Sequence, residues 1–128
     1  LKYIAAGNPL VCVFGCGGDR DATKRPEMGE IAEKYADRIV ITSDNPRSED
    51  PDAIIREIKG GLTTAGRART LCITDRKEGI RTALMTANVG SIVLVAGKGH
   101  EDYQIIKGIK HHFDDKEVIR EFFNEQEQ

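Results

Sequence analysis

"LVCVFG", residues Leu10–Gly15, is a short and continuous apolar run, and the helical pattern "RPEMGEIAEKYA", Arg25–Ala36, follows it. Apolar residues at every position are typical of a parallel strand that is covered on both faces. In the second segment, Pro26 suits the first turn of a helix. Apolar residues recur there at helical spacing, at Met28, Ile31, Ala32 and Tyr35. The order predicts a buried strand followed by a helix that packs through this stripe.

The same alternation continues along the chain. We expect further strands at Arg38–Thr42, Ala68–Thr74 and Ser91–Gly97, and further helices at Asp50–Leu62 and Arg76–Ala87. Strands and helices that take turns in this way form parallel sheets through right-handed crossovers. The sequence therefore predicts an α/β fold with three layers.

Near the C-terminus the pattern changes. "YQIIKGIKHHF", Tyr103–Phe113, predicts two short strands around a turn at Lys107–Gly108, and "DDKEVIREFF", Asp114–Phe123, predicts a closing helix. We therefore expect one domain over residues 1–128, with a mostly parallel sheet and a C-terminal β-hairpin that forms an antiparallel edge.

The composition limits the classes of function. The chain has 128 residues and a formal net charge of −2, so it has no basic surface for a phosphate backbone, and we expect no nucleic-acid partner. No apolar run is long enough to span a bilayer and no leader pattern is present, so we expect a cytoplasmic protein without membrane insertion. The opening "LKYIAAGNP" resembles the last turns of a helix, which indicates a fragment of a longer protein.

The three cysteines indicate neither a disulfide framework nor a metal site. Cys12 and Cys72 lie in apolar, strand-like runs, where reduced core thiols are expected. A zinc site built from Cys12, Cys16 and the three histidines would match no usual ligand spacing. We therefore predict that the chain binds no metal.

Three unusual loops follow predicted strands: "GCGGDRDATKR", Gly15–Arg25, "SDNPRSED", Ser43–Asp50, and "GKGHEDYQ", Gly97–Gln104. In open parallel sheets, ligands bind beyond the carboxyl ends of the strands. All three loops are expected at that edge, so they are the candidate site.

The first loop lacks the third glycine of a dinucleotide fingerprint, because Arg20 stands at that position, and no phosphate-loop Lys-Ser/Thr pair follows. Its glycines would let the backbone turn sharply and project Arg20 over the sheet. The alternative is that Arg20 forms a local ion-pair network with Asp19 and Asp21. Lys24 and Arg25 would face a phosphate on another domain or simply form a solvated helix start.

The second loop presents side chains in fixed directions, because Pro46 restricts its own backbone and that of Asn45. Arg47 can bind a carboxylate with two parallel hydrogen bonds, while Asp44 and Asn45 offer acceptors to an ammonium group. This arrangement suits an amino acid. The alternative is a capping turn, in which Ser48 or Asp50 only caps the next helix.

The third loop places glycines around Lys98, so that the backbone can approach a ligand. Glu101 supplies a carboxylate for an ammonium group, and Gly97 supplies a backbone carbonyl. His100 is expected to be a structural hydrogen-bonding residue, and Tyr103 to pack its ring on the sheet. Together with Arg20 and Arg47, these groups predict a ligand that bears carboxylates and an amine.

Four motifs in this order carry a family resemblance: "VFGCGGDRDATKRP", "TSDNPRSEDP", "VLVAGKGHEDYQ" and "HHFDD". From about Leu10 to Phe123 the chain resembles the C-terminal, Rossmann-like domain of the Mur ligases that add meso-diaminopimelate to the peptidoglycan stem peptide. The resemblance implies a three-domain enzyme that uses ATP and Mg²⁺ to join meso-diaminopimelate to UDP-MurNAc-dipeptide. ATP, Mg²⁺ and the catalytic groups would belong mainly to the central domain, which implies no catalytic or metal-binding residue in this chain.

Motif matching also implies residue roles. A diaminopimelate pocket would be lined by Arg20, Asp44, Asn45, Arg47, Gly97 and Glu101. A less certain transfer places Lys24 and Arg25 at the nucleotide cleft. Rival hypotheses are a dinucleotide-binding oxidoreductase domain, a non-catalytic amino-acid-binding module and a Mur ligase that adds lysine.

Overall fold

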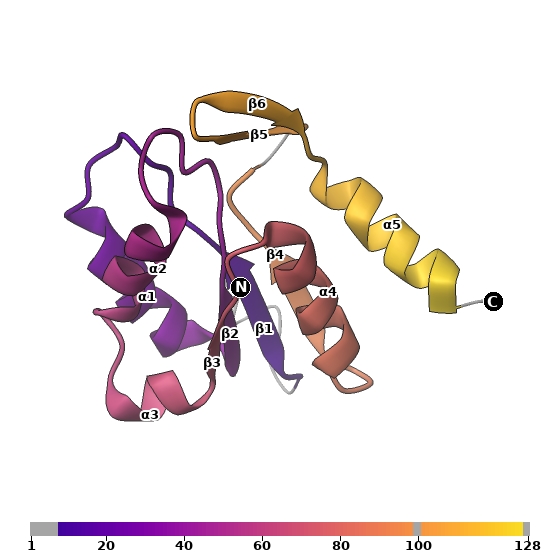
Figure 1. Ribbon diagram of the computed structural model, residues 1–128. Helices are drawn as coiled ribbons and strands as arrows, with labels where there is room; N and C mark the ends of the chain where they lie inside the picture. The colour runs from indigo at the N-terminus through magenta and orange to yellow at the C-terminus, as the bar shows by residue number, and fades with distance from the viewer. Residues whose placement is uncertain (1–7, 99–100, 127–128) are drawn as a thin grey trace.

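The structure is a computed structural model that describes residues 8–98 and 101–126. Four parallel strands form the main sheet in the order β3-β2-β1-β4 (Figure 1). These strands are β1 (Leu10–Phe14), β2 (Arg38–Ile41), β3 (Thr70–Cys72) and β4 (Ile92–Val95). The helices are α1 (Lys24–Tyr35), α2 (Pro51–Lys59), α3 (Thr64–Ala68), α4 (Arg76–Thr86) and α5 (Asp115–Gln126). β2 and β3 are added on one side of β1 and β4 is added on its other side, so the strand order reverses at β1.

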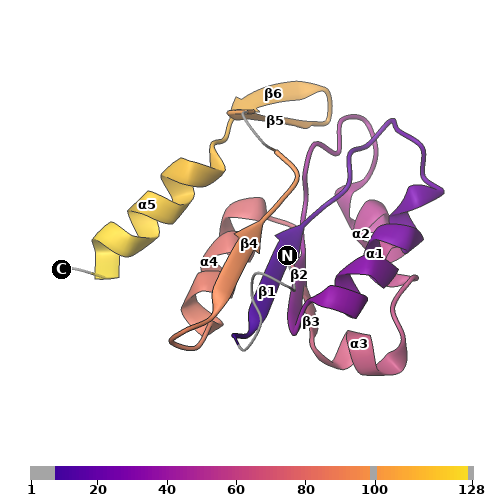
Figure 2. The same cartoon turned by 180° about the vertical axis from the view of Figure 1, so that it is seen from behind.

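Helices cover both faces of this sheet, which confirms the predicted three-layer α/β fold. α1 and α2 lie on one side, and α4 lies on the other with α5 beside it (Figures 1 and 2). Strands β5 (Tyr103–Ile106) and β6 (Ile109–His112) form the predicted antiparallel hairpin. The hairpin is a separate two-stranded sheet, and it lies beyond the carboxyl ends of the main strands (Figure 1). It therefore extends the candidate site and does not widen the sheet edge.

Helix α1 packs through a different face from the predicted stripe. Met28, Ile31 and Tyr35 are 41%, 54% and 45% exposed, and of the four predicted residues only Ala32 is buried. Gly29 is buried instead, against α2. A Cβ atom there would lie 2.3 Å from the Ile58 carbonyl oxygen of α2. The close approach of the α1 and α2 backbones thus requires glycine at this position on the inward face of α1.

Helix α2 follows the predicted pattern. Asp50 caps it by accepting a hydrogen bond from the Asp52 amide at 3.0 Å, and Pro51 occupies its first position. Three isoleucines bury its apolar face: Ile54, Ile55 and Ile58. Ser48 is not a cap, because its hydroxyl donates to Asp19 Oδ1 at 2.6 Å.

Helix α3 was not predicted. It is only five residues long, and the Thr63 side chain caps it by accepting from the Gly66 amide. The edge strand β3 is also short. Cys72 on this strand is exposed, so the prediction that its thiol lies in the core is wrong. Cys12 is half-buried in β1, and burial raises the pKa of its thiol to about 11.

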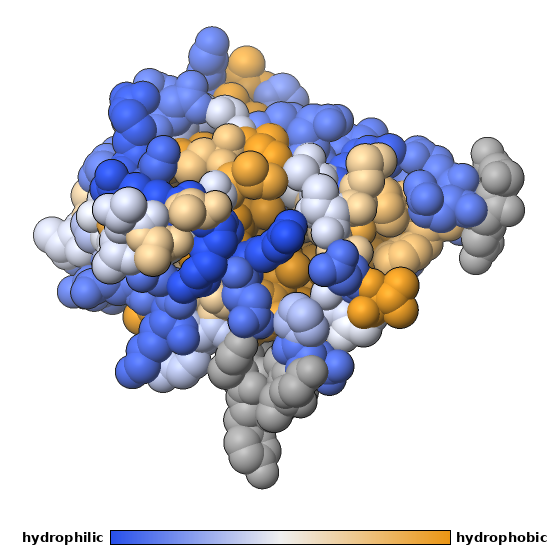
Figure 3. Space-filling view, turned by 90° about the horizontal axis from the view of Figure 1, so that it is seen from below, coloured by the Kyte–Doolittle hydropathy of each residue, from blue (hydrophilic) through white to orange (hydrophobic). Residues whose placement is uncertain are grey.

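The core lies on both faces of β1 and β2. A hollow between α1 and the β1–β4 part of the sheet is lined by Leu10, Cys12, Ile31, Ala32, Tyr35, Ala36 and Leu94. Seen from below, apolar residues gather in the middle of the molecule between polar margins (Figure 3). Within residues 8–98 and 101–126, no helix is long and apolar enough to cross a membrane.

Candidate functional site

Three loops leave the carboxyl ends of β1, β2 and β4 at the same edge of the sheet, as predicted (Figure 2). The loops after β2 and β4 contact each other, since Lys98 Nζ donates to Asn45 Oδ1 at 3.3 Å. The loops after β1 and β4 belong to neighbouring strands, at the point where the strand order reverses. The loop after β2 lies next to the first loop, since the Gly18 amide donates to the Asn45 carbonyl at 2.7 Å. The fold therefore brings the predicted site residues to one edge of the sheet.

The glycines of the first loop permit close packing of neighbouring backbone segments. None of Gly15, Gly17 and Gly18 has a positive φ. A Cβ atom at Gly18 would lie 1.8 Å from the Pro46 carbonyl oxygen. Only glycine allows the two loop backbones to touch at that position.

Asn45 is a buried structural centre of the site, with 1% of its surface exposed. Its Oδ1 accepts from the Ile105 amide at 2.8 Å and from Lys98 Nζ at 3.3 Å. Its Nδ2 donates to Glu101 Oε1 at 3.3 Å. Both hydrogen bonds that Oδ1 accepts come from within the domain, and Nδ2 orients Glu101. The expectation that Asn45 itself meets a ligand's ammonium group stays a prediction.

Arg47 adopts a left-handed backbone, with φ 54°, which is unusual for a residue with a side chain. In this conformation its amide donates to the Ile105 carbonyl at 2.8 Å, and its carbonyl accepts from Gly108. Nη1 donates to the carbonyls of Gly18 at 2.9 Å and Asn45 at 3.4 Å. The residue thus joins the loops after β1 and β2 to the hairpin, and the half-buried guanidinium keeps further donors for a carboxylate.

Asp44 and Glu101 are the two half-buried carboxylates of the site. Burial raises the pKa of Asp44, while the nearby cations Lys98 and Arg76 oppose that rise. Glu101 is held from both sides, by Asn45 Nδ2 and by the Tyr103 hydroxyl, which donates to Oε2 at 3.2 Å. Tyr103 therefore fixes a predicted ligand group as well as packing its ring.

Gly97 has a φ of 118°, a conformation that strongly favours glycine. The position of a missing Cβ would be 3.9 Å from the carboxyl group of Asp44. The exposed Gly97 backbone therefore lies beside the Asp44 carboxylate, as the predicted site requires. Gly99 and His100 lie outside the described residues, so the expectation for His100 has no structural counterpart.

Arg20 is exposed, and its Nη1 makes a long, 3.4 Å hydrogen bond to the Asp19 carbonyl. The alternative ion-pair network is not what holds this loop. Asp19 accepts from Ser48, and Asp21 accepts from the Thr23 hydroxyl at 2.7 Å. The guanidinium of Arg20 thus projects from a loop that other groups make rigid.

Lys24 and Arg25 have different environments. Lys24 is exposed, whereas Arg25 is only 2% exposed. Arg25 Nη2 contacts Glu49 Oε2 at 2.5 Å and the Gly17 carbonyl at 3.0 Å, and Nη1 lies 3.2 Å from Glu57. The solvated helix start is wrong for Arg25, because its side chain is buried in ion pairs that fasten the first loop to α2. The nucleotide contact stays a prediction.

Two further cations were missed from the sequence. The Lys98 ammonium is buried beneath the site. Arg76 binds Asp115 through Nε and Nη2, both at 2.8 Å, and also donates to the carbonyls of Ser43 and Ala96. A cation in the first turn of a helix interacts unfavourably with the helix dipole. The position of Arg76 at the start of α4 was therefore a sequence signal that its side chain has a partner elsewhere in the fold.

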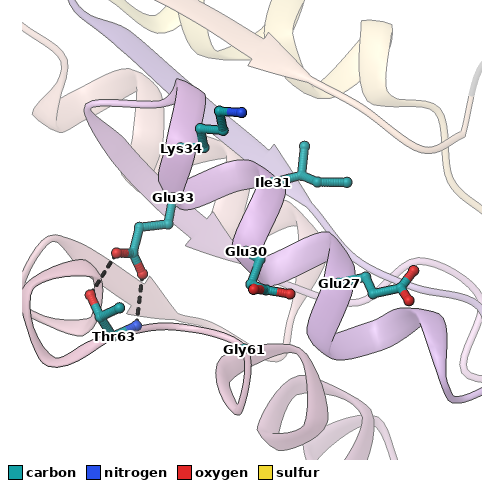
Figure 4. Close-up of a pocket in the computed structure, with 7 residues that line it drawn as sticks. All are labelled: Glu27, Glu30, Ile31, Glu33, Lys34, Gly61 and Thr63. Carbon is teal, nitrogen blue, oxygen red and sulfur yellow. Dashed lines mark hydrogen bonds between the residues drawn. The ribbon is translucent and has the colours of Figure 1, made fainter.

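A groove along α1 is a separate feature, lined by Glu27, Glu30, Ile31, Glu33, Lys34, Gly61 and Thr63 (Figure 4). Its Glu33 carboxylate accepts from the Thr63 amide at 2.8 Å and from the Thr63 hydroxyl at 2.5 Å. The groove shares no residue with the three loops after β1, β2 and β4. Across the described part of the chain, no cluster of His, Cys, Asp and Glu could hold a metal ion.

Comparison with known proteins gives consistent results. Residues 1–99 match the family described as "Mur ligase, glutamate ligase domain". The chain is 57% identical over 115 residues to a protein of Bacteroides thetaiotaomicron and 58% identical over 116 residues to one of Chromobacterium violaceum. Both are named UDP-N-acetylmuramoyl-L-alanyl-D-glutamate--2,6-diaminopimelate ligase.

These alignments cover 90% and 91% of this chain but only 24% and 23% of the relatives, so the chain spans about a quarter of their length. A solved structure of a ligase with the same name superimposes with a TM-score of 0.89 at 46% identity. That match covers 95% of this chain and 25% of the solved chain.

Proposed function

The chain belongs to the Mur ligase family, in its glutamate ligase domain, and on that premise we propose that it is the C-terminal domain of a longer, cytoplasmic, ATP-dependent ligase. The proposed reaction joins meso-diaminopimelate to UDP-MurNAc-L-Ala-D-Glu during peptidoglycan synthesis. The names of relatives more than 50% identical to the chain support this substrate. In this proposal the domain binds the incoming amino acid and closes over the ATP site.

One observation carries the proposal. The Arg47 guanidinium donates a hydrogen bond to the backbone carbonyl of buried Asn45, and the Glu101 carboxylate accepts one from Asn45 Nδ2. A cation and an anion at a fixed separation, on neighbouring loops, suit a ligand with a carboxylate and an ammonium group. Diaminopimelate has both groups at its distal end, whereas lysine has only the ammonium group there.

The other site residues have complementary roles in the proposal. Asp44 and the Gly97 carbonyl accept from the ligand's ammonium group, and Asn45 orients Glu101. Arg20, on the exposed first loop, binds a second carboxylate. Lys24 faces the nucleotide when the domains close.

The described residues do not fit ATP or Mg²⁺. The first loop lacks the Lys-Ser/Thr pair of a phosphate loop, and no described cluster of ligands suits a metal ion. Both groups would be held mainly by the part of the relatives that this chain does not span. We therefore expect the 128-residue chain alone to release no ADP from ATP, and ADP release that depends on diaminopimelate would contradict the proposal.

The test compares meso-diaminopimelate with L-lysine as substrates of the full-length protein, by coupled measurement of ADP release. The informative variant is Arg47→Gly, because glycine accepts the left-handed backbone and so removes the side chain without adding strain. Loss of a buried charge pair costs about 2–5 kcal/mol, so kcat/KM for diaminopimelate should fall about 30- to 5,000-fold. The activity with lysine, which has no distal carboxylate, should change much less.

Lys107→Gly is the matched control. Lys107 is also a cation with a positive φ, 52°, but it stands at the exposed tip of the hairpin. This variant should keep the activity and the substrate preference of the wild type. If Arg47→Gly behaved like Lys107→Gly, the assignment of Arg47 to the ligand's carboxylate would be wrong.

A further inference from the structure

Lys98 is a buried cation that lies between the loops of the proposed site. It is 3% exposed, and its Nζ donates to the Tyr103 carbonyl at 2.7 Å. The same ammonium lies 3.3 Å from Asn45 Oδ1 and 3.4 Å from Asp44 Oδ1. A ligand in the site would not reach this ammonium, so any effect of Lys98 on binding must pass through its neighbours.

The first such neighbour is the Asn45 side-chain amide. A side-chain amide presents an oxygen acceptor at one end and a nitrogen donor at the other. Two donors, Lys98 Nζ and the Ile105 amide, converge on Oδ1 and so fix which end faces inward. Nδ2 must then point at Glu101, which keeps the Glu101 carboxylate an acceptor at that position.

The second neighbour is the Asp44 carboxylate. Its Oδ1 is buried and has no hydrogen-bond partner among the described residues, so the ammonium 3.4 Å away is its main compensation. The charged and titratable groups that face Asp44 are Lys98, Arg76 of α4, Glu101 and the Cys16 thiol. Arg76 is already paired with Asp115, which leaves Lys98 as the cation dedicated to Asp44.

We propose that Lys98 is a positioning residue that orients Asn45 and keeps Asp44 ionised, so that both carboxylates of the site face the ligand's ammonium group as acceptors. The proposal deepens the function proposed above, because it names the residue on which recognition of that ammonium group depends. The physical basis is electrostatic: an opposite charge within about 4–6 Å favours the ionised form of a carboxyl group by about 1–3 pKa units.

The experiment uses Lys98→Met, which keeps the length of the side chain and removes the charge, in the 128-residue chain without ligand. The Asp44 side-chain carboxyl is followed by ¹³C NMR as the pH is changed. Its titration midpoint should rise by about 1–3 pH units relative to the wild type. A purely packing role for Lys98 would leave this midpoint in place, and a change below about 0.3 units would overturn the proposal.

Lys110→Met is the matched control, because Lys110 is an exposed cation 4.4 Å from the Tyr103 ring and has no contact with Asp44. It should leave the Asp44 midpoint unchanged. If Lys98→Met does not fold, the wild-type chain gives a second measurement: the Lys98 Nζ resonance should move as Asp44 is protonated, because the two groups lie 3.4 Å apart. A Lys98 Nζ signal that does not respond to Asp44 would also overturn the proposal.

A kinetic measurement separates this inference from the proposed function. In the full-length protein, Lys98→Met should raise KM for diaminopimelate at least about tenfold, a 1.4 kcal/mol effect, and leave KM for ATP unchanged. If NMR shows the expected shift while neither Lys98→Met nor Arg47→Gly affects diaminopimelate, the substrate assignment fails and the positioning role stands. If Arg47→Gly acts as expected and Lys98→Met does not, only the present inference fails.

Discussion

Replacing the ion pair of Arg76 and Asp115 gives a stability test that the chain itself can provide. The Arg76 side chain is fully buried, and its two bonds to Asp115 are both 2.8 Å long. The same guanidinium donates to the Ser43 carbonyl at 2.9 Å and to the Ala96 carbonyl at 3.2 Å. One side chain therefore fastens α5 to the ends of β2 and β4, immediately before the loops of the candidate site.

The two single variants should differ in a defined way. In Asp115→Leu the guanidinium stays buried without its counter-charge, which should lower the free energy of unfolding by about 3–5 kcal/mol. In Arg76→Met the charge is gone, and Asp115, with a side chain 16% exposed, can regain water. What is lost there is the donor to two backbone carbonyls, about 1–3 kcal/mol for each carbonyl that stays dry.

The double variant is the decisive measurement. Once Arg76 has become Met, no buried charge needs Asp115, so adding Asp115→Leu should cost little more. The wild type, the two single variants and the double variant form a double-mutant cycle. Urea unfolding of these four proteins, followed by far-UV circular dichroism at constant m-value, gives the free energy of unfolding of each. Additive costs, or a cost below about 1 kcal/mol for Asp115→Leu, would refute the argument that a buried charge holds α5 in place.

Two further predictions concern α1 and the first loop. Gly29→Ala should lower the free energy of unfolding by about 1–3 kcal/mol, because the added Cβ would lie 2.3 Å from the Ile58 carbonyl oxygen. Gly60→Ala is the control. Gly60 has a right-handed helical backbone, so this variant should be close to neutral in the same urea assay. A hydrogen bond from Arg25 lowers the pKa of Glu49 in the folded state. Ionised Glu49 therefore stabilises the folded state at pH values above its unfolded pKa of about 4.3. This stabilisation is lost as the pH falls through the lower pKa of the folded state. Glu49→Gln should therefore be less stable than the wild type at pH 7 and approach it in acid, and an equal difference at both pH values would contradict this assignment.

Much of the fold could be predicted from local sequence. Apolar runs such as Leu10–Phe14, and the cap at Asp50 with Pro51 after it, act within a few residues, so they are visible without tertiary structure. The hairpin turn at Lys107–Gly108 has φ values of 52° and 74°, a local backbone preference that the sequence also indicates. Helix α3 escaped prediction because five residues carry too little periodicity.

The candidate site was predicted only in outline. Asp44, Arg47, Gly97 and Glu101 were assigned to one edge because parallel strands end together, and the structure brings these loops together. The partners of the charged side chains could not be assigned in the same way. The decisive ion pairs join residues far apart in the sequence, 24 positions for Arg25 and Glu49 and 39 positions for Arg76 and Asp115, whereas a sequence pattern contains only the spacing along the chain.

The sequence by itself determined the order of the strands and of the helices apart from α3, the three-layer class and the family, since these depend on local patterns and ordered motifs. Tertiary structure alone decided that α1 buries Gly29, that Arg25 is enclosed by glutamates, and that Asn45 and Lys98 lie beneath the site. The physical reason is that burial changes the role of a polar group. A charge removed from water must find a partner in space, and which partner it finds depends on how the elements pack.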